Sequence, residues 1–134
     1  MTRVTDVMTR SVVTVRPDAS LREALTELAS ENISGAAVTD ARGRLIAAIS
    51  RSDIMEAEAE TSDPDAWECL LDNTLVQDLM TSPALTIAPE ADLKDAALAM
   101  EYGEVHRLFV ESEGKLVGVV SRSDISRALA LGRI

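Results

Sequence analysis

One five-residue sequence, Ser-Arg-Ser-Asp-Ile, occurs twice in this chain, at residues 50–54 and at residues 121–125. Each copy directly follows an apolar run, at residues 45–49 and 116–120. A short continuous apolar run indicates a buried strand, and the Ser-x-x-Asp pattern indicates a helix start. A strand that leads into a helix is therefore predicted twice, and this internal repeat constrains the fold more than any other feature.

The segments before this pattern repeat in the same order. Residues 76–81 resemble residues 4–9 and lie 72 positions later. Each copy continues with a short alternating stretch that ends in Pro, which predicts a strand. Ser20 and Asp92 then predict helix N-caps, and apolar residues follow both at helical spacing. With a hairpin before the repeated pentapeptide, each unit reads strand, helix, strand, strand, helix, so the predicted fold class is α/β (α+β).

Between the repeats lies an acidic segment without a counterpart. The sequence Ser62-Asp63-Pro64 predicts an N-cap with Pro in the first turn, and Trp67, Leu70 and Leu71 would form the packed side of a short helix. The acidic side chains here lack the spacing and the glycine of a calcium loop, so we expect no metal site. We divide the chain into a first repeat at residues 1–58, an acidic linker helix at 59–74 and a second repeat at 75–134.

Charge and composition exclude several classes of function. The formal net charge is −10, so we expect no nucleic-acid partner, because binding to phosphates needs a basic face. No apolar run approaches the roughly 20 residues that span a bilayer, and the N-terminus lacks the apolar core of a signal peptide. The single cysteine, Cys69, fits a reducing compartment. These features predict a cytoplasmic protein without a membrane partner.

The complete series, present twice, resembles the CBS domain, and the tandem resembles the CBS pair, or Bateman module, of a stand-alone CBS domain protein. The resemblance implies two β-α-β-β-α repeats that pack sheet to sheet with pseudo-two-fold symmetry, and it implies a homodimer. It also implies clefts between the repeats that bind AMP, ADP, ATP or S-adenosylmethionine. No cofactor is required in this family.

The same resemblance assigns ribose binding to one serine and one aspartate in each repeat: Ser50, Asp53, Ser121 and Asp124. One carboxylate can accept hydrogen bonds from both ribose hydroxyls, and the helix start favours its negative charge. The second repeat also has the glycine of the family pattern, Gly118, whereas the first has Ala47, which we expect to narrow its half-site slightly. Ser-x-x-Asp is equally an N-capping pattern, so the residues alone leave a purely capping role open.

His106 and Arg107 resemble the segment that holds phosphates in the gamma subunits of AMP-activated kinase. A guanidinium can bind a phosphate through two parallel hydrogen bonds, and an imidazole adds a donor. A surface pair in which Arg107 bridges to a carboxylate is the alternative. Aromatic residues make up only 2% of the chain, so adenine would lie among small and aliphatic side chains. We assign this pocket to Ile33, Ser34, Ala48, Val105 and Val119.

In this family the ribose aspartate of one repeat works with the strand start of the other. A first cleft would combine Ser50 and Asp53 with residues 105–107 and bind a phosphorylated nucleotide. A second would combine Ser121 and Asp124 with residues 33–35 and be weaker, empty or suited to a ligand without phosphate.

The predicted function is a regulatory adenosine-nucleotide sensor in signal transduction, acting on an unidentified partner in trans. The alternatives are a ligand-free dimerisation or interaction scaffold and an S-adenosylmethionine sensor. We expect no enzyme, because the chain has no Walker loop, no dinucleotide-binding glycine pattern and no zinc-ligand spacing, and a dyad of Cys69 and His106 lacks a third partner.

Overall fold

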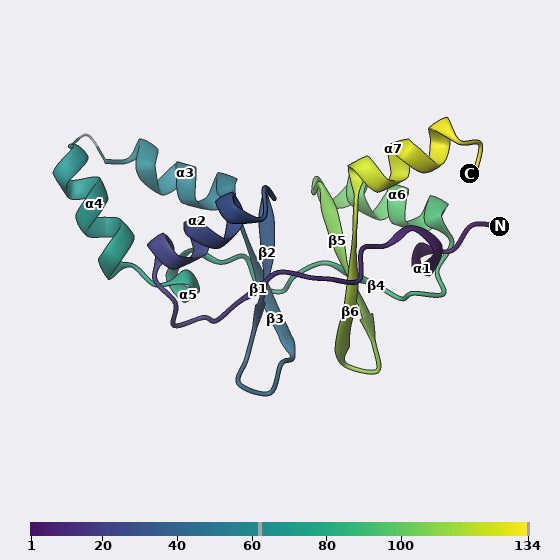
Figure 1. Cartoon of the computed structure of the whole chain (residues 1–134), viewed down its shortest axis with the longest axis horizontal. Coiled ribbons are helices and arrows are strands. Elements are labelled where there is room, and N and C mark those ends of the chain that lie inside the picture. Colours follow the sequence, from purple (N-terminus) through teal and green to yellow (C-terminus); the bar gives the residue numbers. More distant parts are fainter. Residues whose placement is uncertain (62, 134) are drawn as a thin grey trace. The chain divides into compact units, whose positions relative to one another are not determined.

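The computed structural model describes residues 1–61 and 63–133, and its chain divides into two compact units. Unit 1 consists of Met1–Val12 and Ala84–Ile134, and unit 2 consists of Val13–Pro83. Each unit has one three-stranded sheet with its own helices, so the mixed α and β fold class is confirmed (Figure 1). No helix within the described residues has the length and apolar character needed to cross a membrane.

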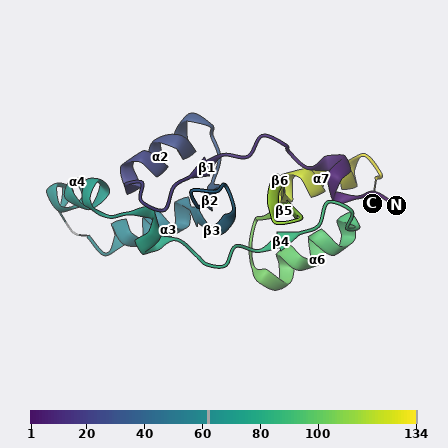
Figure 2. The ribbon, with the colours of Figure 1, turned by 90° about the horizontal axis from the view of Figure 1, so that it is seen from below.

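Unit 2 shows the predicted order of elements. Its sheet has the order β1-β2-β3, in which β1 runs parallel to β2, and β2 runs antiparallel to β3. Both α2 and α3 lie on the same side of this sheet (Figures 1 and 2). The bounds in unit 2 are β1 (Thr14–Val15), α2 (Leu21–Ser30), β2 (Gly35–Thr39), β3 (Leu45–Ser50), α3 (Arg51–Ala59), α4 (Pro64–Asn73) and α5 (Val76–Leu79).

Unit 1 repeats this arrangement. Its sheet has the order β4-β5-β6, again with one parallel and one antiparallel pair, and α6 and α7 lie on one side of it. The bounds in unit 1 are α1 (Val4–Val7), β4 (Thr86–Ile87), α6 (Leu93–Gly103), β5 (Arg107–Ser112), β6 (Lys115–Ser121) and α7 (Arg122–Ala130). The predicted series of strand, helix, strand, strand, helix is thus present twice.

Local sequence signals explain where the first helix of each unit begins. The Ser20 hydroxyl accepts a hydrogen bond from the backbone N–H of Glu23 at 3.1 Å, and the Asp92 carboxylate accepts one from that of Lys94. Both predicted N-caps are therefore confirmed. The faces that follow are buried, because Leu21 and Leu93 have no exposed surface and lie in the cores of their units.

The opening segment of each sequence repeat packs in the unit that the other repeat forms. Thr9 exchanges two backbone hydrogen bonds of 2.9 Å with Val119 of β6, whereas Thr81 exchanges bonds of 2.8 and 3.0 Å with Ala48 of β3. The predicted boundaries, 1–58, 59–74 and 75–134, follow the sequence repeats, whereas the compact units are divided after residues 12 and 83. Each opening segment thereby adds a backbone bridge to the antiparallel edge of a sheet.

The acidic linker contains the predicted helix, α4, which packs on α2. Asp63 caps it and Pro64 is its first residue, while Ser62 of the predicted cap lies outside the described residues. The predicted apolar side is confirmed, because Leu71 is buried in the core of unit 2 and its neighbours Trp67 and Leu70 pack against that core.

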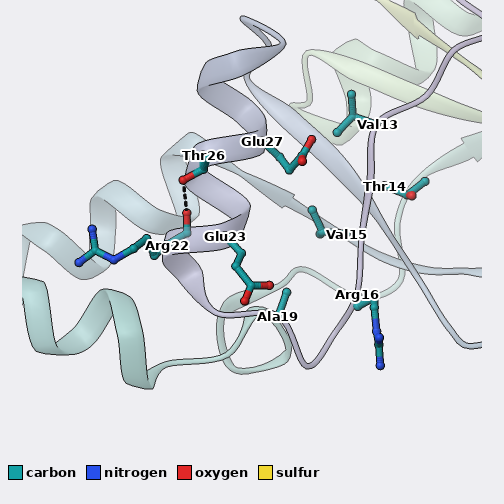
Figure 3. Close-up of a pocket in the computed structure, with 9 residues that line it drawn as sticks. All are labelled: Val13, Thr14, Val15, Arg16, Ala19, Arg22, Glu23, Thr26 and Glu27. Carbon is teal, nitrogen blue, oxygen red and sulfur yellow. Dashed lines mark hydrogen bonds between the residues drawn. The ribbon is translucent and has the colours of Figure 1, made fainter.

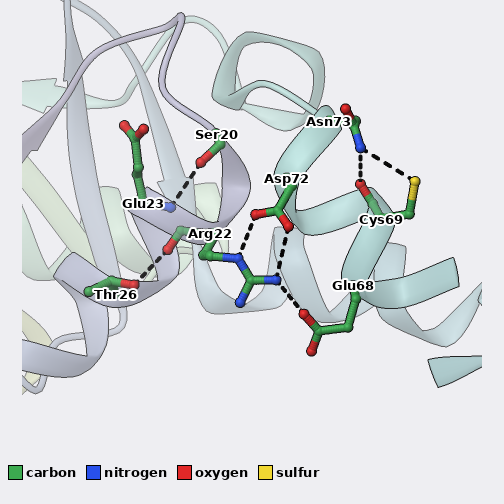
Figure 4. A network of polar contacts seen from close by, with 8 residues as sticks. All are labelled: Ser20, Arg22, Glu23, Thr26, Glu68, Cys69, Asp72 and Asn73. Carbon is green, nitrogen blue, oxygen red and sulfur yellow. Dashed lines mark hydrogen bonds and ion pairs between the residues drawn. The ribbon is translucent and has the colours of Figure 1, made fainter. Parts of the chain in front are cut away.

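Arg22 on α2 holds this helix by two ion pairs (Figure 4). Its Nε donates to Asp72 Oδ1 at 2.5 Å, and its Nη2 pairs with Glu68. Both acidic residues lie on α4, one turn apart, so a single guanidinium bridges the two helices at the surface.

Candidate ligand-binding site

In unit 1, Ser121 and Asp124 form a reciprocal capping box at the start of α7. The backbone N–H of Ser121 donates to Asp124 Oδ2 at 2.8 Å, and the backbone N–H of Asp124 donates to Ser121 Oγ at 3.2 Å. The Ser121 hydroxyl also donates to Oδ2 at 3.0 Å. The second oxygen, Oδ1, lies 3.4 Å from Nη1 of Arg127, and the residue Asp124 is buried. Both oxygens of this carboxylate are therefore engaged within unit 1.

In unit 2, Ser50 and Asp53 form the equivalent box at the start of α3. The backbone N–H of Ser50 donates to Asp53 Oδ2 at 2.9 Å, and the backbone N–H of Asp53 donates to Ser50 Oγ at 3.2 Å. Asp53 is half-buried, and across residues 1–61 and 63–133 its Oδ1 has neither a hydrogen bond nor an ion pair. The capping role is thus real in both units and uses only Oδ2 of each aspartate, whereas Oδ1 has a partner in unit 1 and none in unit 2 within the described residues.

Each unit places its own strand start beside its own capping box. In unit 1, Arg107 is the register partner of Ser121, and the His106 carbonyl accepts a hydrogen bond from the N–H of Arg122 at 2.9 Å. In unit 2 the same positions are held by Gly35 opposite Ser50 and by Ser34, whose carbonyl accepts from Arg51. The predicted pairing of Asp53 with His106 joins residues of different units and stays a prediction.

The residues assigned to adenine are distributed over both units. Ala48 and Val119 are the strand residues that bridge to Thr81 and Thr9, and both are half-buried. Ile33 and Val105 are also half-buried, and each packs partly against the core of its own unit. Ser34 is exposed. All five residues keep accessible surface, and their assignment to an adenine pocket stays a prediction.

Gly118 has a packing role that the sequence reasoning missed. A Cβ atom at this position would lie 2.7 Å from Met8 Sδ and 3.0 Å from the Thr9 carbonyl oxygen. The glycine of the family pattern therefore gives space to the opening segment of the chain. The sequence contained a signal for this contact, since the Met-Thr segment and the position of Gly118 both recur in the two repeats at nearly the same spacing.

The open groove shown in Figure 3 lies elsewhere in unit 2, between β1 and α2, and has a volume of about 580 Å³. None of the predicted site residues lines it. Its charged side chains have both signs, so it does not select for a phosphate. The lining residues are Val13, Thr14, Val15, Arg16, Ala19, Arg22, Glu23, Thr26 and Glu27.

Outside the capping boxes, two carboxyl groups have a lowered pKa. A hydrogen bond from Arg22 holds the pKa of Asp72 below its ordinary value, and the backbone N–H of Arg44 does the same for the pKa of Asp40. Both belong to structural contacts, at α4 and at the β2–β3 turn. Among the described residues, no three His, Cys, Asp or Glu side chains are grouped so that they could hold a metal ion.

The comparisons with known proteins agree with this architecture. The CBS domain family model matches residues 4–60 and 76–131. An uncharacterized protein of Methanocaldococcus jannaschii is 29% identical over 94% of this chain, which spans 42% of that relative's length. The CBS domain protein PAE2072 from Pyrobaculum aerophilum, solved with AMP, superposes with a TM-score of 0.83 at 27% identity, covering 98% of both chains. CBSX2 in complex with AMP also gives 0.83 at 27% identity, covering 96% of this chain and 97% of the other.

Two tandem β-α-β-β-α repeats with a capped Ser-x-x-Asp at each final helix define a CBS domain pair. The chain belongs to the CBS domain family, and the predicted recognition of that family is confirmed.

Proposed function

We propose that this protein is a regulatory module that binds an adenosine nucleotide, AMP, ADP or ATP, and acts on a partner protein in trans. The observation that carries the proposal is the Asp53 carboxylate, which uses Oδ2 for the helix cap and leaves Oδ1 unpaired within the described residues. An ionised oxygen at a helix start is a strong acceptor for a ribose hydroxyl. The AMP complexes of two proteins that share this fold at 27% identity support the choice of ligand.

Each part of a nucleotide has a matching group in this proposal. Asp53 accepts from the ribose hydroxyls, with Ser50 beside it, and Asp124 with Ser121 is the equivalent pair of unit 1. His106 and Arg107 bind phosphate, because both can donate hydrogen bonds from cationic or polar N–H groups. The adenine lies among the half-buried residues Ile33, Ala48, Val105 and Val119, with Ser34 as a polar neighbour. In this proposal the protein acts by binding the nucleotide and catalyses no reaction on it.

Regulation follows if the ligand favours one conformation of the chain. A ligand shifts a conformational equilibrium only by its differential affinity for the two states.

The charge distribution favours a partner surface on unit 2. This unit has five arginines and 14 acidic residues, which give a net charge of −9, whereas unit 1 has eight basic and nine acidic residues and a net charge of −1. A homodimer and a protein partner in trans are both part of this proposal, and a ligand-free scaffold is the second candidate that the same charge asymmetry favours.

Thermal unfolding of ligand-stripped protein with AMP, ADP, ATP, S-adenosylmethionine and adenosine tests the proposal. A ligand at about 100 times its dissociation constant adds roughly 2.7 kcal/mol to the free energy of unfolding, which shifts the midpoint visibly for a chain of this size. We expect the nucleotides to stabilise more than adenosine, and we expect Arg107→Ala to remove that difference. Stabilisation by S-adenosylmethionine alone would move the ligand away from phosphates, and no stabilisation by any compound would favour the scaffold.

A further inference from the structure

The two ribose aspartates differ in what faces their second oxygen. Three residues after Asp124, on the next turn of α7, Arg127 places Nη1 3.4 Å from Oδ1. Three residues after Asp53, the same position of α3 is occupied by Glu56, which has no group that can donate to a carboxylate. The two repeats thus share the Ser-x-x-Asp motif but differ three residues after the aspartate, where the second has a cation and the first an anion.

This difference decides which oxygen a ligand can reach. In both units Oδ2 already accepts the backbone N–H of the capping serine, so Oδ1 has more acceptor capacity left for a ribose hydroxyl. Arg127 already donates to Oδ1 of Asp124, whose side chain is only 11% exposed, so a ribose hydroxyl competes with the guanidinium for this oxygen. At Asp53 no hydrogen bond or ion pair of Oδ1 within the described residues competes with a ribose hydroxyl.

We propose that Arg127 is a specificity-determining residue of the Asp124 half-site, where it competes with ribose hydroxyls and makes this half-site weaker than that of Asp53. The inference rests on the proposed function, because it concerns the same ligand class. It gives a physical reason for unequal occupancy, independent of the phosphate-binding residues. The Arg127 side chain is 66% exposed, so it can leave Asp124 for water without steric cost.

The expected change in AMP affinity follows from the typical strength of such an ion pair. Pairs between a helix residue and the third residue after it, with one exposed partner, contribute modestly to stability. Removing such a competitor corresponds to about a two- to fivefold gain in affinity at the Asp124 half-site. Placing an arginine at position 56 should produce a loss of similar size at the Asp53 half-site.

Isothermal titration with AMP, with one half-site disabled at a time, tests this inference. Asp53→Asn leaves the Asp124 half-site intact, and adding Arg127→Gln to it should tighten AMP binding by about two- to fivefold. Asp124→Asn leaves the Asp53 half-site intact, and adding Glu56→Arg should weaken binding by about the same factor. Arg133→Gln on the Asp53→Asn background is the control, since it removes one positive charge at an exposed residue beyond α7.

The outcomes separate this inference from the proposed function. No heat of AMP binding in the wild-type protein or in any variant would overturn both. AMP binding that Arg127→Gln leaves unchanged, weakens, or alters only as much as Arg133→Gln does would overturn the role of Arg127 and leave the nucleotide-binding function standing.

Discussion

A pair of matched substitutions, Val4→Ala and Val76→Ala, tests the exchange of opening segments between the repeats. The two valines lie 72 residues apart at equivalent positions of the sequence repeat, and neither has exposed surface. Val4 belongs to the core of unit 1, where its backbone N–H donates to the Ala91 carbonyl at 2.9 Å. Val76 belongs to the core of unit 2, where its N–H donates to the Ala19 carbonyl at 2.8 Å. Each substitution should therefore weaken the unit formed mainly by the other repeat.

The magnitude follows from the carbons removed. Valine to alanine deletes two buried methyl groups, and burial of each carbon contributes about 0.8 kcal/mol. The cavity that remains adds to this loss because the surroundings relax only partly, so we expect a total of about 2–3 kcal/mol. Since about 1.4 kcal/mol changes an equilibrium constant tenfold, a loss of 2 kcal/mol raises the open population of a unit about 30-fold.

Hydrogen exchange of the backbone amides locates the effect. Units that open cooperatively show a common change in exchange rate, distinct from that of the rest of the chain. Val4→Ala should raise exchange in β5 and β6 by about 30-fold or more and affect β2 and β3 less. Val76→Ala should give the opposite pattern. If Val4→Ala instead raised exchange in β2 and β3 and left β5 and β6 protected, the opening segment would pack with its own repeat and the reasoning would be wrong.

Three further predictions concern stability. Gly118→Ala should lower the free energy of unfolding by about 1 kcal/mol, measured by urea denaturation, because its Cβ would press on the opening segment; no loss would show that this segment yields freely. Glu113 has a φ of 51° in the β5–β6 turn, so Glu113→Asn should raise the melting temperature through a gain of about 0.5–1 kcal/mol, and an unchanged or lower midpoint would contradict this. Because Arg22 lowers the pKa of Asp72, their contact stabilises fully above the unfolded pKa and is lost as pH falls through the lowered folded value. Trp67 fluorescence should then report loosening of α4 below about pH 4, and Arg22→Gln should abolish this acid dependence; an unaltered pH profile in the variant would refute the link.

The order of elements could be predicted because its signals are local. Caps at Ser20, Asp63 and Asp92 and the apolar spacing behind them act over a few residues, and the structure has a helix after each. The exchange of opening segments could not be predicted in this way. Residues 4–9 and 76–81 are similar in sequence, so local signals do not distinguish them, and the choice of sheet depends on contacts far apart in the sequence.

The candidate site was predictable in part for the same reason. Ser50 with Asp53, and Ser121 with Asp124, were identified from a repeated motif, and both pairs do form capping boxes. The contact of Arg127 with Asp124 was not predicted, because an exposed arginine three residues after an aspartate is common on helices. Comparing the repeats position by position would have drawn attention to it, since Arg127 of the second repeat aligns with Glu56 of the first.

The capping role and the ligand role of the motif can be separated at Ser50 and Asp53. Ser50→Ala removes the hydroxyl that accepts the Asp53 N–H, and loss of such a cap costs about 1 kcal/mol. Asp53→Asn keeps an amide oxygen that can accept the Ser50 N–H. It loses only the attraction between the negative charge and the positive end of the helix dipole, which contributes about 0.5 kcal/mol.

The two variants should therefore rank in opposite orders in two experiments. In urea denaturation without ligand, Ser50→Ala should be the less stable protein. In the presence of AMP, it should keep much of the ligand-induced stabilisation, whereas Asp53→Asn should lose most of the part due to its half-site, because an amide cannot provide an ionised acceptor for two hydroxyls. If Asp53→Asn were the less stable protein without AMP and gained as much from AMP as the wild type, Asp53 would be a capping residue and the ribose would bind elsewhere.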